Sequence, residues 1–205
     1  MIAAHQTMLA PQGAPLPYDA EVEYLESTGT QYINTEVNLK NSLSISARIA
    51  FTTFSSGDVA FGARGSSSSS NCRVLTFTIS GTGDCIVVQR SKFQTTRNIV
   101  ADTAFHDYFI SSSAIKIDNT QFASSNIGNT TAPIFLCRQN VNNETSSPSY
   151  SKIRISSFSI VDNGVLVRDY IPVRVGQTGY LFDNVSKQLF GNAGTGAFVI
   201  GPDKT

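Results

Sequence analysis

A strict alternation of apolar and polar residues constrains this chain more than any other feature. Residues 42–51 read "SLSISARIAF", in which every second residue from Leu43 to Phe51 is apolar and the others up to Arg48 are serine or arginine. Successive side chains of a β-strand point to opposite faces, so this period of two predicts a half-buried strand. Such a strand needs a second layer of structure to cover its apolar side.

Similar strand-like stretches recur along the chain, and none of the sequence has a convincing helical pattern. The predicted strands are 73–79, 85–90, 107–111, 114–118, 132–138, 152–162, 164–171, 179–183, 187–191 and 196–201. Roughly a dozen short strands separated by turns are typical of an all-β protein. The sequence therefore predicts a two-sheet antiparallel sandwich or jelly roll.

Turn residues predict three hairpins between these strands. Residues 162–164 read Asp-Asn-Gly, and Asn and Gly tolerate the positive φ angles of a tight hairpin. The segments 182–190 ("FDNVSKQLF") and 81–84 ("GTGD") indicate the other two.

The apolar phase slips within the strand at 152–162. Ile153 and Ile155 are in step with each other, whereas Phe158 falls one residue out of phase. One extra residue in a strand produces such a slip, so we expect a β-bulge near Ser156-Ser157.

Composition limits the classes of function. The chain has 205 residues, which suits one domain, and its 15 basic and 15 acidic residues give no net charge. That balance lacks the basic footprint of a nucleic-acid-binding protein. No stretch reaches the roughly 18 apolar residues that cross a bilayer, so we expect no membrane span.

Residues 1–17 differ from the rest of the chain. They are rich in proline and methionine and show no strand alternation, which indicates an N-terminal arm before a domain at 18–205. The arm lacks the basic start of a secretory signal. The sequence is compatible with two interpretations of this arm: a disordered tail, or a short anchor that docks on another subunit.

Three stretches carry a resemblance to a known family. They are "EYLESTGTQYINT" at 23–35, "FGARG" at 61–65 and "GVLVRDYIPVRVGQTGYLFDNVSKQLFGNAGTGAFVIGPD" at 164–203. Together they resemble laminin-G-like, concanavalin-like lectin and glucanase domains that gut bacteria and their phages encode. The resemblance covers about 18–203 and implies a jelly roll of two curved sheets. It also implies that 164–203 pairs beside the first strands.

The resemblance implies a function in binding rather than catalysis. In phage proteins, domains of this type belong to fibres, tails or head decorations and often contact host glycans. We therefore expect a non-enzymatic module on a virion surface, bound to other virion subunits through its arm. Such proteins are often symmetric homo-oligomers, so a dimer or trimer is expected. A purely structural virion subunit that binds no sugar is the alternative.

A glycan site usually combines an aromatic platform with polar hydrogen-bonding groups. Loops that offer such mixtures supply the predicted binding residues, which are Arg64, Arg138, Asn140, Asn142, Asn143 and Tyr150. Arg168 and Asp169 belong to the closing signature, and we interpret them as an ion pair or turn brace.

An enzyme, specifically a glycoside hydrolase, is the alternative to a binding or structural module. Glu21, Glu23 and Glu26 form E-x-E-x-x-E, which is similar to the E-x-D-x-x-E strand of some β-sandwich glucanases. A retaining hydrolase needs two carboxylates about 5–5.5 Å apart in a cleft. The motif here starts the domain, its middle residue is Glu, and the chain has no Trp to stack on sugar. We therefore expect no enzymatic activity from this trio.

Other site chemistry has weaker support. His106-Asp107 could be half of a catalytic triad, but the chain has no G-x-S-x-G nucleophile elbow. Asp58, Asp84 and Asp118 lie at predicted strand ends, where some laminin-G-like domains hold calcium. The sequence shows no acidic cluster, so we expect no cofactor and keep calcium as an alternative.

Overall fold

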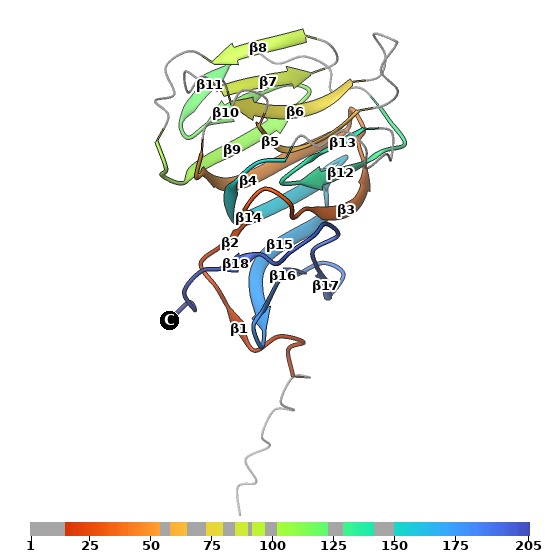
Figure 1. Ribbon diagram of the computed structural model, residues 1–205. Helices are drawn as coiled ribbons and strands as arrows, with labels where there is room; N and C mark the ends of the chain where they lie inside the picture. Colours follow the sequence, from red (N-terminus) through yellow and green to blue (C-terminus); the bar gives the residue numbers. More distant parts are fainter. Residues whose placement is uncertain are drawn as a thin grey trace, which may run out of the picture.

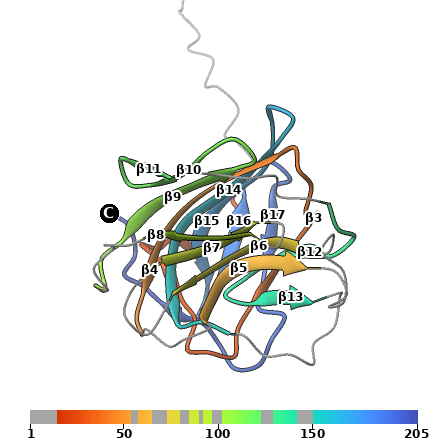
Figure 2. The same cartoon turned by 90° about the horizontal axis from the view of Figure 1, so that it is seen from above.

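The protein folds as two packed β-sheets. A computed structural model describes residues 15–53, 58–64, 73–79, 85–89, 92–96, 102–122, 129–141 and 150–205, and these residues contain strands but no helix. One sheet has eleven strands and the other seven, here named the large sheet and the small sheet (Figure 1, Figure 2). The predicted all-β, two-sheet class is confirmed.

The large sheet follows the order β11-β10-β9-β4-β14-β15-β16-β17, with β1 beside β15, β2 beside β14 and β18 beside β2. Its strands are β1 (Ala20–Glu21), β2 (Leu25–Glu26), β4 (Leu43–Phe51), β9 (His106–Ser111), β10 (Ile115–Ile117), β11 (Thr120–Phe122), β14 (Ile153–Asp162), β15 (Val165–Val175), β16 (Thr178–Asp183), β17 (Gln188–Phe190) and β18 (Val199–Ile200). All of its pairings are antiparallel.

The small sheet follows the order β3-β12-β5-β6-β7-β8, and β13 also pairs with β5. Its strands are β3 (Ile33–Asn38), β5 (Asp58–Arg64), β6 (Arg73–Ile79), β7 (Cys85–Gln89), β8 (Lys92–Thr96), β12 (Pro133–Leu136) and β13 (Gln139–Val141). The β13–β5 pairing is parallel, which departs from the wholly antiparallel sandwich that the sequence predicts.

The core lies between the two sheets. Every predicted inward residue of β4 is buried, from Leu43 to Phe51, and Ile33, Phe61 and Ile134 meet them from the small sheet. Complete burial of a Leu, Ile or Phe side chain contributes about 1.5–3 kcal/mol. The alternation in residues 42–51 is therefore the signature of a strand that faces this core.

The closing segment returns beside the first strands, as the resemblance implies. β1 pairs with β15, β18 pairs with β2, and Val22 bridges to Asp203 (Figure 1). The expected bulge is also present, because the register of β14 against β4 shifts between Ile155 and Ser157. Residues before the bulge pair with β2 and residues after it pair with β15.

Two of the three predicted hairpins are described as a whole. Asn163 and Gly164 both have positive φ, and Asp183 pairs with Gln188 across the second turn. For the third, β6 and β7 pair as predicted, while the turn residues 81–84 lie outside the described residues. Residues 1–14 of the expected arm lie outside them as well.

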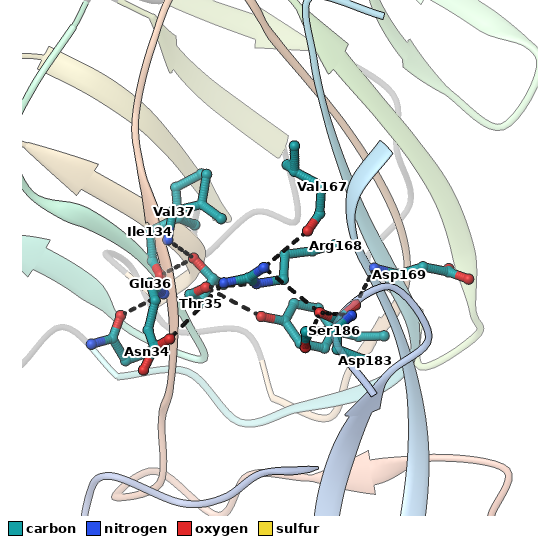
Figure 3. Close-up of polar contacts among 11 residues, drawn as sticks. Asn34, Thr35, Glu36, Val37, Ile134, Val167, Arg168, Asp169, Asp183 and Ser186 are labelled. Atoms are coloured by element: carbon teal, nitrogen blue, oxygen red, sulfur yellow. Dashed lines mark hydrogen bonds and ion pairs between the residues drawn. The ribbon is translucent and has the colours of Figure 1, made fainter. Parts of the chain in front are cut away.

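Arg168 links the large sheet to the small sheet (Figure 3). Glu36 has a φ of 60°, and the ladder between β3 and β12 is irregular at this point. The carbonyl oxygen of Thr35 accepts hydrogen bonds from Arg168 Nε at 3.1 Å and from the Tyr170 hydroxyl at 3.3 Å. One backbone carbonyl of β3 is thus held by two side chains of β15.

Asp183 holds the other side of this link and is completely buried (Figure 3). Its carboxylate accepts hydrogen bonds from the backbone amides of Asp169, Val185 and Ser186 and from the Ser186 hydroxyl. Arg168 Nη1 lies 3.7 Å from it. Burial alone would raise the pKa of Asp183, but these hydrogen bonds outweigh burial and lower it.

The predicted structural role of Arg168 and Asp169 is realised through different partners. The two side chains do not form an ion pair with each other. Arg168 contacts Asp183 and Glu36, whereas the Asp169 carboxylate accepts a hydrogen bond from Asn184 Nδ2 at 3.1 Å. Neighbouring residues of one strand point to opposite faces, so each side chain braces its own side of β15.

We predict that D183A lowers the free energy of unfolding by about 3 kcal/mol at pH 7, because it leaves buried donors unsatisfied. Urea unfolding of the full chain measures this loss. K40M, which breaks the exposed Lys40–Asp162 pair, serves as the control and should cost less than about 1 kcal/mol. Equal losses in the two variants would contradict the structural role of Asp183.

A second prediction concerns the glycines of the closing segment. A Cβ at Gly194 would collide with the carbonyl oxygen of Thr30, whereas a Cβ at Gly164 meets no atom within 4 Å. G194A should therefore lower the free energy of unfolding by about 2 kcal/mol or more. G164A should lower it by only about 1 kcal/mol, the strain of its φ of +81°. Thermal unfolding of both variants compares the two losses of unfolding free energy. A larger loss in G164A than in G194A would contradict the prediction.

Candidate functional site

A groove crosses the outer face of the large sheet, on the side away from the core. Its volume is about 210 Å³, and β14, β4, β9 and β10 form its floor. The lining residues are Ser46, Ala47, Asp107, Tyr108, Phe109, Lys116, Asp118 and Ser157. We name it the outer groove.

The strand register explains why the surface is hollow here. Ser159 pairs with Ser46, Ser46 with Phe109, and Phe109 with Lys116, so these four residues form one row across the sheet. Residues of one row point to the same face. The central strands supply short serines and the neighbouring strands supply long side chains. The difference in side-chain length makes a trough with Phe109 as its wall.

The outer groove offers an aromatic face beside polar groups. Phe109 is half-buried, and the ammonium group of Lys116 lies 5.9 Å from the centroid of its ring. Ser46 and Ser157 are exposed, and their hydroxyls make no hydrogen bond to any described residue. These groups are therefore available to a molecule that enters the groove.

The two carboxylates of the outer groove are already engaged. Asp107 Oδ2 lies 2.9 Å from Arg48 Nη1. Asp118 accepts from the backbone amide of Asp107 at 3.0 Å and lies 2.8 Å from His106 Nδ1. Lys116 differs from them, because no carboxylate of a described residue lies within 4.0 Å of its ammonium group.

His106 does not pair with Asp107 through its side chain, as a catalytic half-triad would require. Its Nδ1 contacts Asp118, and its Nε2 lies 3.0 Å from Asp102 Oδ1. Burial lowers the pKa of His106, but the hydrogen bonds to Asp118 and Asp102 outweigh burial and raise it. The imidazole therefore ties the segment before β9 to the turn after β10.

The predicted binding residues Arg138 and Asn140 lie in the interior instead of on a loop. Arg138 is 1% exposed, with its guanidinium carbon 5.1 Å from the ring centroid of Tyr32 and 4.9 Å from that of Tyr150. Asn140 is fully buried and donates to the carbonyl of Pro133 at 2.8 Å. A ligand in solvent does not reach either side chain, which corrects the expected surface position.

Two further residues of the predicted set, Arg64 and Tyr150, lie at separate points along the small sheet. Arg64 pairs with Val141 in the parallel β5–β13 ladder, and Tyr150 is half-buried and bridges to Arg138. The side chain of Arg64 is outside the described part of the chain, as are Asn142 and Asn143. Glycan binding by these residues therefore stays a prediction.

The three glutamates of the E-x-E-x-x-E motif have separate surroundings. Glu26 lies 2.7 Å from Arg154 Nε, Glu21 lies 3.5 Å from Lys204 Nζ, and Glu23 is exposed. The chain leaves the sheet between β1 and β2, so the three glutamates do not belong to one continuous strand. None of the three lines the outer groove.

The possible calcium ligands do not form a group among the described residues. There, no set of three or more His, Cys, Asp or Glu side chains could hold a metal ion. Asp118 instead contacts His106, and Asp58 begins β5 with an undescribed side chain. Asp84 lies outside the described residues.

The predicted binding residues do not include Phe109 and Lys116 of the outer groove, although the sequence marks the outward position of both. Tyr108 and Ile110 mark the inward phase of β9, so Phe109 is an aromatic residue on the outward phase. Lys116 stands between Ile115 and Ile117 in the same way. An aromatic residue in the polar phase of a strand, beside serine strands, is the pattern that could have located the outer groove.

Comparison with known proteins adds no family to this description: no family model and no curated protein matches the chain. The laminin-G-like resemblance of the closing segment thus remains a prediction. Separately, the described residues contain no helix of the length and apolarity that a membrane crossing requires.

We predict that NMR titration of the full chain gives His106 a pKa above 6.5, and that D118N lowers it. D107N is the matched control, since Asp107 makes no contact with the imidazole. Because the folded pKa is raised, this contact stabilises the fold fully below about pH 6.5 and loses that effect as pH rises through the folded pKa. A His106 pKa of 6.5 or lower would contradict the two carboxylate contacts.

Proposed function

We propose that this protein is a non-enzymatic β-sandwich module that binds a cell-surface glycan in its outer groove. The observation that carries the proposal is the position of Phe109, a half-buried aromatic ring beside exposed serines on a sheet. Glycan sites combine such an aromatic platform with a few polar groups.

The geometry suits a sugar ring of an extended chain. The apolar face of a pyranose stacks on Phe109, and its hydroxyls exchange hydrogen bonds with Ser46, Ser157 and Asp107. All four residues belong to paired strands, so binding orders no loop. The groove is open and shallow, and a single site of this kind binds weakly.

The setting that we propose for this module is the surface of a phage particle, as a fibre, tail or head decoration. The resemblance of 23–35 and 164–203 to phage-encoded domains supports it. Residues 1–17 would attach the module to other virion subunits, and a homo-oligomer would present several weak sites at once.

The test is a glycan array with the full chain displayed as a multimer, including capsular polysaccharides of gut bacteria. We expect a reproducible hit that F109A reduces about tenfold, because stacking on an aromatic ring contributes about 0.5–1.5 kcal/mol in addition to the apolar area that it buries. Y18A is the matched control, since Tyr18 is also a half-buried aromatic but lies outside the groove. Its binding should equal that of the wild type.

Two results would contradict the proposal. An array without hits from well-folded protein would favour the alternative of a structural virion subunit. A hit that F109A leaves unchanged would move the site elsewhere, with Arg64 and Tyr150 as the next candidate residues.

A further inference from the structure

One charged group of the outer groove, the ammonium group of Lys116, has no ion pair to a described residue. Asp107 is matched by Arg48, and both oxygens of Asp118 are bonded, one to His106 and one to a backbone amide. Lys116 has no carboxylate partner among the described residues, and its ammonium group lies 5.9 Å from the centroid of the Phe109 ring. The groove therefore presents, beside its aromatic wall, an ammonium group that is not in an ion pair with a described residue.

A ligand that complements these groups needs an apolar face and a negative charge close together. Lys116 and Phe109 are direct partners across the β9–β10 ladder, so their side chains occupy the same row. A carboxylate or sulfate on the edge of a pyranose ring reaches the ammonium group while the ring face stacks on Phe109. A neutral sugar would leave Lys116 without a partner.

We propose that the outer groove selects acidic glycans, in which a carboxylate or sulfate of the sugar ring pairs with Lys116. This inference rests on the proposed glycan-binding function and names its ligand class. The pair forms on an open surface, so its strength falls as salt rises. Stacking on Phe109 depends much less on salt, and the two contributions are therefore separable.

The experiment uses an array of matched pairs and the full chain as a multimer. The acidic members are polygalacturonate, alginate, hyaluronan and chondroitin sulfate, and each stands beside its carboxyl-reduced or desulfated counterpart. We expect the chain to bind at least one acidic member and to bind its neutral counterpart about two- to fivefold more weakly. Comparison of the carboxyl-reduced and desulfated forms distinguishes the two anionic groups.

K116Q tests the residue itself, and K152Q is its matched control. Lys152 is an exposed lysine without an ion pair to any described residue, and it lies outside the groove, so both variants lose the same charge. K116Q should remove the preference for the acidic member and its salt dependence, while K152Q should keep both.

The remaining results overturn the inference. Binding of neutral members that K116Q leaves unchanged would refute the acidic ligand and leave glycan binding intact. Acidic binding that K116Q and K152Q weaken equally would reflect overall charge and not this groove. Absence of binding to every member, together with a hit on a neutral capsular polysaccharide that F109A reduces, would remove this inference and leave the proposed function. Absence of binding on both arrays would remove the two together.

Discussion

The contact between Arg168 and the Thr35 carbonyl is the constraint on which the sandwich depends. A backbone carbonyl that leaves its ladder inside a protein needs another donor, and Arg168 and Tyr170 supply two from the opposite sheet. Asp183, held by amides of the closing hairpin, fixes the other end of the guanidinium group. The closing signature of the sequence is thus a structural device that joins the sheets.

The core residues and Asp183 are buried, whereas the outer face of β4, β9 and β10 is held by exposed contacts such as Arg48–Asp107 and His106–Asp118. Ser46 and Lys116 are exposed on this face, and Phe109 is half-buried. Their backbone positions are nevertheless set by the strand ladders. A site on such strands can change its ligand without loss of the core, since surface substitutions away from structural contacts usually change stability little.

Local pattern predicted the fold well but did not locate the outer groove. The alternation in 42–51 and the phase slip near Ser156 are local, so they appear in the sequence as they do in the structure. β8 (Lys92–Thr96) was missed, because its polar residues show no periodicity and only its pairing with β7 makes it a strand. Arg138 and Asn140 were expected on surface loops but are buried, for a similar reason. The parallel pairing of β13 with β5 buries a stretch that reads as a polar loop.

Amide NMR would show directly whether the ligand binds in the outer groove. The labelled full chain would be titrated with the oligosaccharide that binds it most tightly, and the shift of each backbone amide followed. We predict that the largest shifts occur at Ser46, Phe109, Lys116 and Ser157, across the outer face of the large sheet. Largest shifts at Val141 or Tyr150, or no specific shifts at all, would contradict this prediction.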